Sequence, residues 1–210
     1  MLLTKPRAAR VLLNNISWEM FENLLLDLGD RPGVRLAYNF GTLEIMTPLP
    51  EHEYYKEVIG DLVKDLAEEL DLDYESFGST TWRRAIKEAG VEPDNCFYFQ
   101  NFPIIRGQLE FDLNQDPPPD LALEIDLSSK SLSRFPIYVR LGFPEIWCYE
   151  DGEITIYLLE KEEYIKAENS LIFPQLPIQE LPSLIELNRH EGRRAIRRVV
   201  RAWVREKMAD

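Results

Sequence analysis

Strict alternation between apolar and polar residues marks positions 120–127 of the chain. Leucine or isoleucine fills every second position, and the positions between them hold aspartate, alanine, glutamate and aspartate. Because side chains of a β-strand point alternately to its two faces, the pattern predicts a strand with one wholly apolar face. Another layer has to cover that face, so we expect a sheet packed against helices. The opposite face carries Glu124 and Asp126.

These two acids allow two interpretations. The strand lies at the edge of the sheet and its acids are solvated, or the acids bind a cation. Asp94, which follows Pro93 on another predicted strand, supplies a third carboxylate. Carboxylates this close repel one another unless a cation or a proton intervenes. Mg²⁺ takes oxygen ligands and keeps waters that a phosphate can displace, so the second interpretation predicts metal-assisted phosphodiester hydrolysis.

Other periodicities place further elements along the chain. Ser17 is a suitable N-cap for a helix that ends at Gly29, alternation predicts a hairpin over 34–46, and apolar spacing predicts a long helix over 51–70. Further strands are expected over 74–77, 82–86, 94–99, 145–149, 153–159, 164–165 and 171–173. Helices are expected over 131–141 and 189–207, with an irregular connection over 103–119. This order predicts one α/β (α+β) domain over residues 1–210, a mixed β-sheet flanked by helices.

Composition limits the class of protein. The chain has 210 residues, of which 45% are hydrophobic, and this suits one domain with a substantial core. Cys96 and Cys148 stand far apart and outside any zinc-ligand pattern, so a zinc cluster is not expected. No segment approaches the ~20 apolar residues of a membrane span, and the first residues lack a cleavable signal pattern. We therefore expect a cytoplasmic protein with no membrane partner.

The net charge of −13 argues against generic nucleic-acid binding, but the charge is unevenly distributed. Residues 189–207 carry +6 and the rest of the chain carries −19. The predicted terminal helix has arginines on one stripe and apolar residues on the other. Its basic face either lies in water or contacts a phosphate backbone or the acidic surface of another subunit, as in a homodimer. The candidates for nucleic-acid contact are Arg194, Arg197, Arg198 and Arg201.

Five short motifs occur in an order typical of one family. They are Glu51-His52, Gly78-Ser79-Thr80-Thr81, Glu92-Pro93-Asp94, Pro119-Asp120 with Glu124-Ile125-Asp126, and Phe135-Pro136-Ile137-Tyr138 through Gly142-Phe143-Pro144-Glu145-Ile146-Trp147. At these residues the chain resembles the PD-(D/E)XK nuclease superfamily. Within it, the chain is similar to the restriction endonuclease-like proteins grouped as domain of unknown function 820. The resemblance covers most of the chain and implies a restriction endonuclease-like fold.

The resemblance also implies roles for individual residues. Asp94 would be the aspartate of the PD element and a metal ligand, and Glu124 would be the second metal ligand. The position two residues further on is usually lysine in the superfamily, and here it is Asp126. In relatives with this departure the lysine is often supplied from the next helix, where this chain has Arg134, with Lys130 nearby.

A carboxylate from the first long helix often completes the site in the superfamily. Glu51 is the first candidate and His52 the second, since both lie at the start of that helix near its inward face. The alternative is that Glu51 only favours the helix N-terminus through the helix dipole.

Arginine in place of lysine changes the expected chemistry. Arginine stays charged and cannot act as a general base, although it can stabilise negative charge in a transition state. Water activation would then fall on the metal or on Asp126. The sequence therefore predicts an Mg²⁺- or Mn²⁺-dependent endonuclease acting on DNA, with catalytic Asp94, Glu124, Asp126 and Arg134. A weak or inert nuclease fold that binds nucleic acid or a protein, and an enzyme acting on another small phosphoester, remain the alternatives.

Overall fold

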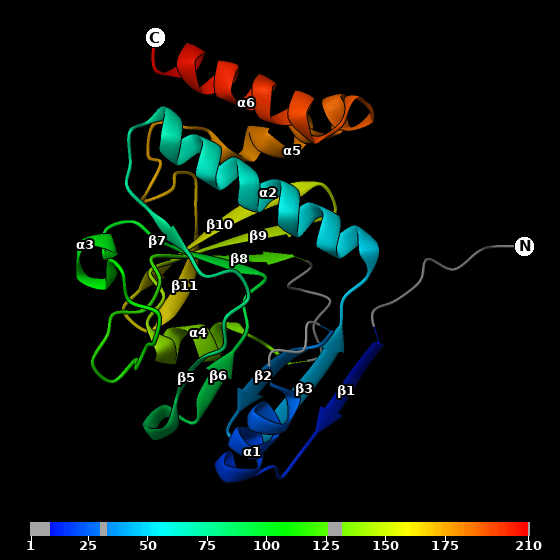
Figure 1. Cartoon of the computed structure of the whole chain (residues 1–210), viewed down its shortest axis with the longest axis vertical. Helices are drawn as coiled ribbons and strands as arrows, with labels where there is room; N and C mark the ends of the chain where they lie inside the picture. The colour runs from blue at the N-terminus through cyan, green and yellow to red at the C-terminus, as the bar shows by residue number, and fades with distance from the viewer. Residues whose placement is uncertain (1–8, 30–32, 126–131, 210) are drawn as a thin grey trace, which may run out of the picture.

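The strands of this protein form two sheets, of five and six strands, and helices pack on both faces of the larger sheet (Figure 1). The computed structural model describes residues 9–29, 33–125 and 132–209. The expected mixed α/β fold with flanking helices is confirmed, with the strands divided between two sheets. None of the helices in the described ranges is long and apolar enough to cross a membrane.

The smaller sheet is antiparallel throughout its described strands. In spatial order these are β1 (Ala9–Leu13), β3 (Thr42–Thr47), β2 (Arg35–Asn39), β6 (Ala89–Val91) and β5 (Trp82–Arg84). Helix α1 (Trp18–Leu28) packs on it through Phe21, whose ring leaves room for no side chain at Gly90: an added Cβ would lie 2.8 Å from the ring. The Ser17 hydroxyl caps α1 by accepting from the Met20 amide at 3.1 Å, as its sequence predicts.

The larger sheet holds the strand with the alternating pattern near its centre. Its spatial order is β11 (Glu163–Ala167), β10 (Glu153–Glu160), β9 (Glu145–Glu150), β8 (Leu121–Ile125), β7 (Asn95–Tyr98) and β4 (Glu75–Ser76). Strands β8 and β9 run parallel, and α4 (Phe135–Leu141) lies in the connection between them. A parallel pair needs such a crossover, which places α4 on one face of the sheet.

Three helices cover the other face of the larger sheet. Figure 1 shows α2 (Pro50–Glu69) lying along the sheet, with α5 (Leu181–Asn188) and α6 (Arg193–Lys207) beside it, and α4 on the side of the smaller sheet. Side chains of α2, α5 and α6 share one core with β7 to β10, whereas α4 shares a second core with the opposite face. The face carrying Asp94 and Glu124 therefore looks toward α4 and the smaller sheet.

The alternation in β8 is confirmed, and the interpretation of it as an edge strand is wrong. Leu121, Leu123 and Ile125 pack in the core beneath α2, while Ala122 faces the core around α4. Strand β8 is paired on both sides, by β7 and β9, and Glu124 is completely buried.

Other expectations need correction. The sequence missed β1, β6, α5 and the short helix α3 (Phe102–Ile105), each of which is short or contains proline or glycine. Residues 171–173 form no strand; the Ser170 hydroxyl instead accepts from the amides of Ile172 and Phe173 in a local turn. Helix α4 begins at Phe135, and α6 begins after Gly192 rather than at Arg189 because a 3₁₀ turn precedes it.

Candidate active site

Two buried carboxylates meet where β7 begins and β8 ends. The register pairs Asn95 with Leu123, and the Asp94 amide donates to the Leu123 carbonyl at 3.0 Å, so Asp94 lies opposite Glu124. Residues opposite each other in an antiparallel pair project from the same face. Asp94 is 1% exposed and Glu124 is 0% exposed. The fold thus brings together the two acids for which the resemblance implies metal binding.

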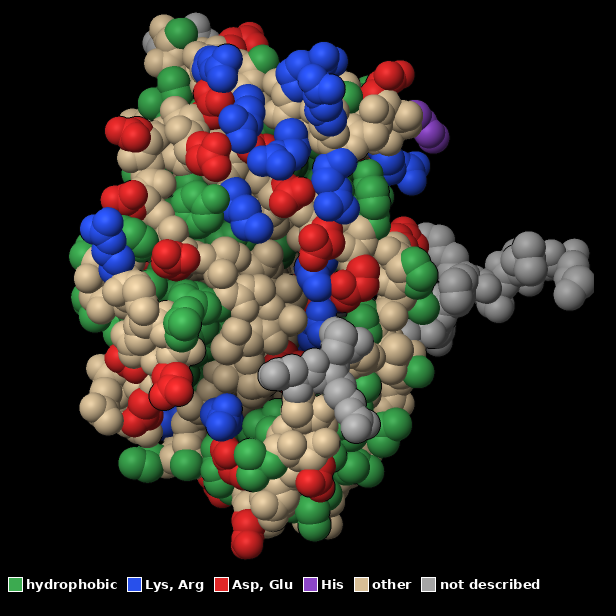
Figure 2. Space-filling model, in the orientation of Figure 1, with side chains coloured by type: hydrophobic (Ala, Val, Ile, Leu, Met, Phe, Trp, Pro, Cys, Tyr) green, Lys and Arg blue, Asp and Glu red, His purple; other side chains and the backbone are tan. Residues whose placement is uncertain are grey.

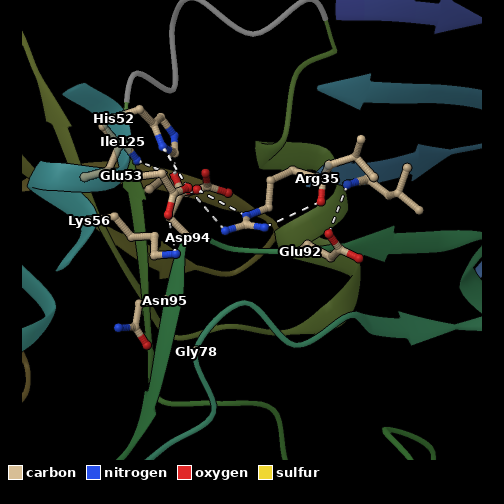
Figure 3. Close-up of polar contacts among 12 residues, drawn as sticks. Arg35, His52, Glu53, Lys56, Gly78, Glu92, Asp94, Asn95 and Ile125 are labelled. Atoms are coloured by element: carbon tan, nitrogen blue, oxygen red, sulfur yellow. Dashed lines mark hydrogen bonds and ion pairs between the residues drawn. The ribbon is translucent and has the colours of Figure 1, made fainter. Parts of the chain in front are cut away.

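Three elements converge on Asp94 (Figure 3). Its Oδ2 accepts a hydrogen bond from the Ile125 amide at 2.8 Å. His52 of α2 places Nε2 3.2 Å from the same oxygen, and Arg35 of β2 places Nε 3.9 Å from Oδ1. His52 is 6% exposed, yet neither ring nitrogen has hydrogen-bond geometry toward a described residue. The site therefore contains a buried imidazole with hydrogen-bonding capacity that its described neighbours do not use.

Glu124 is oriented by a tyrosine from α4. The Tyr138 hydroxyl donates a short hydrogen bond to Glu124 Oε1. Burial, and next the negative charge of Glu124, raise the pKa of Tyr138 well above its ordinary value. The phenol consequently stays protonated and remains a donor to this carboxylate.

A buried arginine supplies positive charge beside the carboxylates. Arg134 Nη2 lies 3.1 Å from Glu44 Oε1, and both side chains are 0% exposed. The other oxygen of Glu44 accepts from the Leu132 amide at 3.0 Å. Burial by itself would lower the pKa of Arg134, but the negative charges around it, with Glu124 first, raise that pKa overall. Arg134 is therefore a permanent cation among several buried carboxylates.

The sequence analysis missed Glu44 as a member of this cluster. Glu44 lies on β3 of the smaller sheet and shares a strand face with the buried Met46. An acid on the same face as an apolar residue is the signal that the sequence offered. Its partner Arg134 lies 90 residues further along the chain, so only the fold could pair them.

The remaining site residues expected from the sequence are Asp126, Lys130, Glu51 and His52. Asp126 and Lys130 lie outside the described residues. Glu51 is exposed at the start of α2, whereas His52 is buried against Asp94. Of the two accessory candidates from this helix, the fold brings His52 to the carboxylates.

The donor chemistry of the site fits a hard divalent cation. Asp94 and Glu124 provide the carboxylate oxygens that Mg²⁺ prefers. Among the described residues, no three His, Cys, Asp or Glu side chains are arranged to hold a metal ion together. Mg²⁺ commonly takes only one or two carboxylates and keeps several waters, so a ligand set of two carboxylates is compatible with it.

Two arginines of the C-terminal helix bind a buried acid of α2. Arg197 donates to both carboxylate oxygens of Asp65, from Nε to Oδ2 at 2.7 Å and from Nη2 to Oδ1 at 2.8 Å. Arg201 Nε also donates to Oδ1 at 2.7 Å. Asp65 is 0% exposed, and these bonds satisfy both of its oxygens.

The acidic partner of the arginine stripe is thus a helix of the same chain. Arg205 continues the pattern with Glu69, at 2.6 Å from Nε to Oε2. Figure 2 shows basic and acidic side chains interleaved where α6 lies beside α2. Arg194 and Arg198 are exposed. Of the four candidates for nucleic-acid contact, these two have their side chains most open to solvent.

Asp65→Asn is expected to lower the free energy of unfolding by about 2 kcal/mol, because charge-assisted bonds to two arginines are weakened. Urea unfolding followed by fluorescence measures this change. Asp61→Asn, one turn earlier on α2, is the matched control, because the partly exposed Asp61 lies 3.7 Å from an exposed arginine, Arg193. The control should lose less than about 0.5 kcal/mol. Equal losses of unfolding free energy in the two variants would show that the bonds of Asp65 to α6 do not stabilise the protein more than the pair of Asp61 does.

Comparisons with known proteins place the chain in a family. Over residues 18–189 it matches the family model described as "Uma2: Putative restriction endonuclease". No curated protein matches the chain. Among solved structures it is similar to a "putative nuclease belonging to DUF820 from Anabaena variabilis ATCC 29413", with 14% identity and a TM-score of 0.41, over 65% of this chain and 79% of that one. Because the match with the family model spans most of its length, this chain belongs to the Uma2 family of restriction endonuclease-like proteins, as its motifs predict.

Proposed function

We propose that this protein is a metal-dependent endonuclease that hydrolyses phosphodiester bonds of DNA. Membership of the Uma2 family supports nuclease activity. The observation that carries the proposal is the buried pair Asp94 and Glu124, brought to one face by neighbouring strands and surrounded by groups that orient them. Acids are unfavourable in the middle of a sheet, so burying two of them together requires a compensating role.

Asp94 and Glu124 would hold Mg²⁺ or Mn²⁺. When bound, such an ion acidifies a coordinated water and neutralises charge on the phosphate. The Ile125 amide and the Tyr138 hydroxyl each donate to one of the two carboxylates and fix its direction. These contacts limit the motion of the ligands before substrate arrives, as preorganised sites require.

Arg134 takes a positioning role in this proposal. Its guanidinium is completely buried and pairs with Glu44, so it acts on the reaction through the carboxylates rather than by touching substrate. It cannot accept a proton from water. Histidine is a residue type that can, and His52 Nε2 lies 3.2 Å from Asp94 Oδ2. Asp126, outside the described residues, keeps the auxiliary role that the resemblance implies.

A supercoiled-plasmid nicking assay tests the proposal. Wild-type protein should nick plasmid in Mg²⁺ or Mn²⁺ and should stop in EDTA. Asp94→Asn should nick roughly a hundredfold more slowly, because it removes a ligand charge at the site. Asp73→Asn, at an exposed position, is the matched control and should nick like wild type.

The other outcomes distinguish the alternative functions. Wild-type protein that binds plasmid but nicks it no faster than Asp94→Asn would refute the nuclease proposal and favour a binding module. Metal-dependent hydrolysis of a small phosphodiester such as bis(p-nitrophenyl) phosphate, without plasmid nicking, would point to a small phosphoester as the substrate.

A further inference from the structure

A polar cavity of about 840 Å³ lies beside the carboxylate site, between the β2–β3 hairpin, the first turns of α2 and the turn at 77–81. Its lining includes Arg35, Glu53, Lys56, Thr81, Arg83 and Glu92. Arg35 connects the cavity to the site, because its Nε lies 3.9 Å from Asp94 Oδ1. In Figure 3, Arg35 from β2 and Lys56 from α2 reach toward the same region beside Asp94.

Arg35 is buried beside the carboxylates of Glu53 and Asp94, but its hydrogen-bond donors are incompletely satisfied. The residue is 7% exposed, its Nη2 lies 3.4 Å from Glu53 Oε1, and its Nη1 lies 3.5 Å from the Val34 carbonyl. Its Nε makes no hydrogen bond to any described residue. A buried guanidinium has five donors, and leaving them poorly satisfied costs free energy. An anion entering the cavity would satisfy donors that the protein itself does not.

The lining of the cavity brings together three basic side chains, Arg35, Lys56 and Arg83, and two acidic ones. Arg83 pairs with Glu22, outside the lining, at 2.9 Å. Glu53 forms ion pairs with two of these cations. Lys56 Nζ lies 2.8 Å from its Oε2, and Arg35 Nη2 lies 3.4 Å from its Oε1. The carboxylate of Glu92 is hydrogen-bonded to other residues of the cavity wall: it accepts from the Thr81 hydroxyl at 2.7 Å and from the Leu36 amide at 3.2 Å.

The ligand that fits this cavity best is a phosphate of a polynucleotide. Arginine binds phosphate through its planar fork of donors, and lysine binds it as a point charge. The volume lies within the range that holds a ligand of nucleotide size, roughly 300–1,000 Å³. Phosphates recur at regular short intervals along a strand, so a strand whose scissile phosphate lies at Asp94 and Glu124 would bring a neighbouring phosphate into the cavity.

The geometry points to the Arg35–Lys56 cavity as a binding subsite for a DNA phosphate next to the one that is cut. This inference rests on the proposed nuclease function and adds a site that positions the strand. Neither residue was a candidate in the sequence, because one begins a hairpin strand and the other lies on a long charged helix.

Binding measured without catalysis tests the subsite. Fluorescence anisotropy with a short fluorescein-labelled DNA duplex in EDTA gives the dissociation constant and its salt dependence. Lys56→Gln and Arg35→Gln should each weaken binding roughly tenfold, because each removes a charged hydrogen bond to phosphate. Each should also reduce the slope of log K against log salt by about 0.9. Lys64→Gln, which lies on α2 outside the cavity, is the matched control and should change neither quantity by as much.

A neutral linkage in the duplex identifies the phosphate concerned. One methylphosphonate, moved along one strand, should weaken binding of wild type at one position and have no further effect on Lys56→Gln at that position. Additive losses at every position, or Lys56→Gln binding like Lys64→Gln, would overturn the subsite, as would wild type that does not bind the duplex. Thermal unfolding of each variant distinguishes loss of binding from misfolding. If Arg35→Gln does not fold, the binding of Lys56→Gln alone tests the subsite.

The two proposals fail separately. Wild type that binds through Arg35 and Lys56 but does not nick plasmid would retain the subsite and refute the nuclease. Wild type that nicks plasmid, with Lys56→Gln binding and nicking equally well, would retain the nuclease and refute the subsite.

Discussion

Arg134→Met is expected to lower the free energy of unfolding by about 3–5 kcal/mol, which is the usual cost of removing one partner from a buried ion pair. The substitution leaves Glu44 completely buried without its cation. It also removes a cation whose largest favourable electrostatic interaction is with Glu124. Several carboxylates would then share a low-dielectric interior with less compensation, and their mutual repulsion would add to the cost.

Urea unfolding monitored by tryptophan fluorescence measures this loss. Arg140→Met on the same helix is the matched control: Arg140 is half-buried, donates to Asn39 at 2.7 Å and lies over the ring of Phe40. The control should lose about 1 kcal/mol, the value of an ordinary surface hydrogen bond and cation–π contact. A loss for Arg134→Met no greater than that of the control would contradict the buried charge cluster.

The double variant Glu44→Gln with Arg134→Met shows how much of the lost stability comes from leaving Glu44 without its cation. If Glu44 were the sole carboxylate that Arg134 compensates, removing both charges would restore most of the stability. Because Arg134 also lies near Glu124 and Asp94, the double variant should recover only part of it. The coupling in this double-mutant cycle measures how much of the arginine's charge Glu44 uses.

Glu124→Gln is expected to slow plasmid nicking roughly a hundredfold or more while changing the free energy of unfolding by less than about 1 kcal/mol. Glutamine has nearly the same volume as glutamate, and its Oε1 can still accept from Tyr138. The substitution also removes one of several like charges in the buried cluster. If Glu124 serves the reaction rather than the stability of the fold, its substitution should lower the nicking rate and leave the free energy of unfolding nearly unchanged.

Nicking rates and urea midpoints measured on the same preparations test that separation. Glu153→Gln, an exposed position on β10, controls for loss of negative charge and should resemble wild type in both measurements. An unchanged nicking rate in Glu124→Gln would remove Glu124 from the reaction. Collapse of stability and activity together would assign it a structural role.

Elements whose signal is local in the chain were correctly predicted. Helix α1 has its cap at Ser17, α2 has an apolar stripe over five turns, and the hairpin of β9 and β10 has the Asp151-Gly152 turn with both residues at positive φ. The short strands β1 and β6 and the helix α5 lacked such signals. They are stabilised by pairing and packing with distant segments, which no local window of sequence contains.

The partner of a charged helix face is likewise not contained in the local sequence, as the arginine stripe of α6 shows. The sequence revealed a helix with basic residues on one face and left water, phosphate or another subunit as its partner. Tertiary structure placed Arg197 and Arg201 on the buried Asp65 of α2. Asp65 lies between Lys64 and Leu66 and outside the apolar stripe that the sequence predicts for this helix, so the sequence did not indicate its burial.

The sequence by itself determined the family, the strand that carries Glu124, and the pairing of Glu124 with Asp94 as candidates, because periodicity and short motifs are properties of adjacent residues. Tertiary structure decided which other groups surround them: Glu44 and Arg35 from the smaller sheet, His52 and Lys56 from α2, and Tyr138 from α4. Charge compensation and hydrogen bonding act over a few ångströms in space, whatever the separation along the chain. The composition of the site was therefore fixed only when the two sheets and α2 packed together.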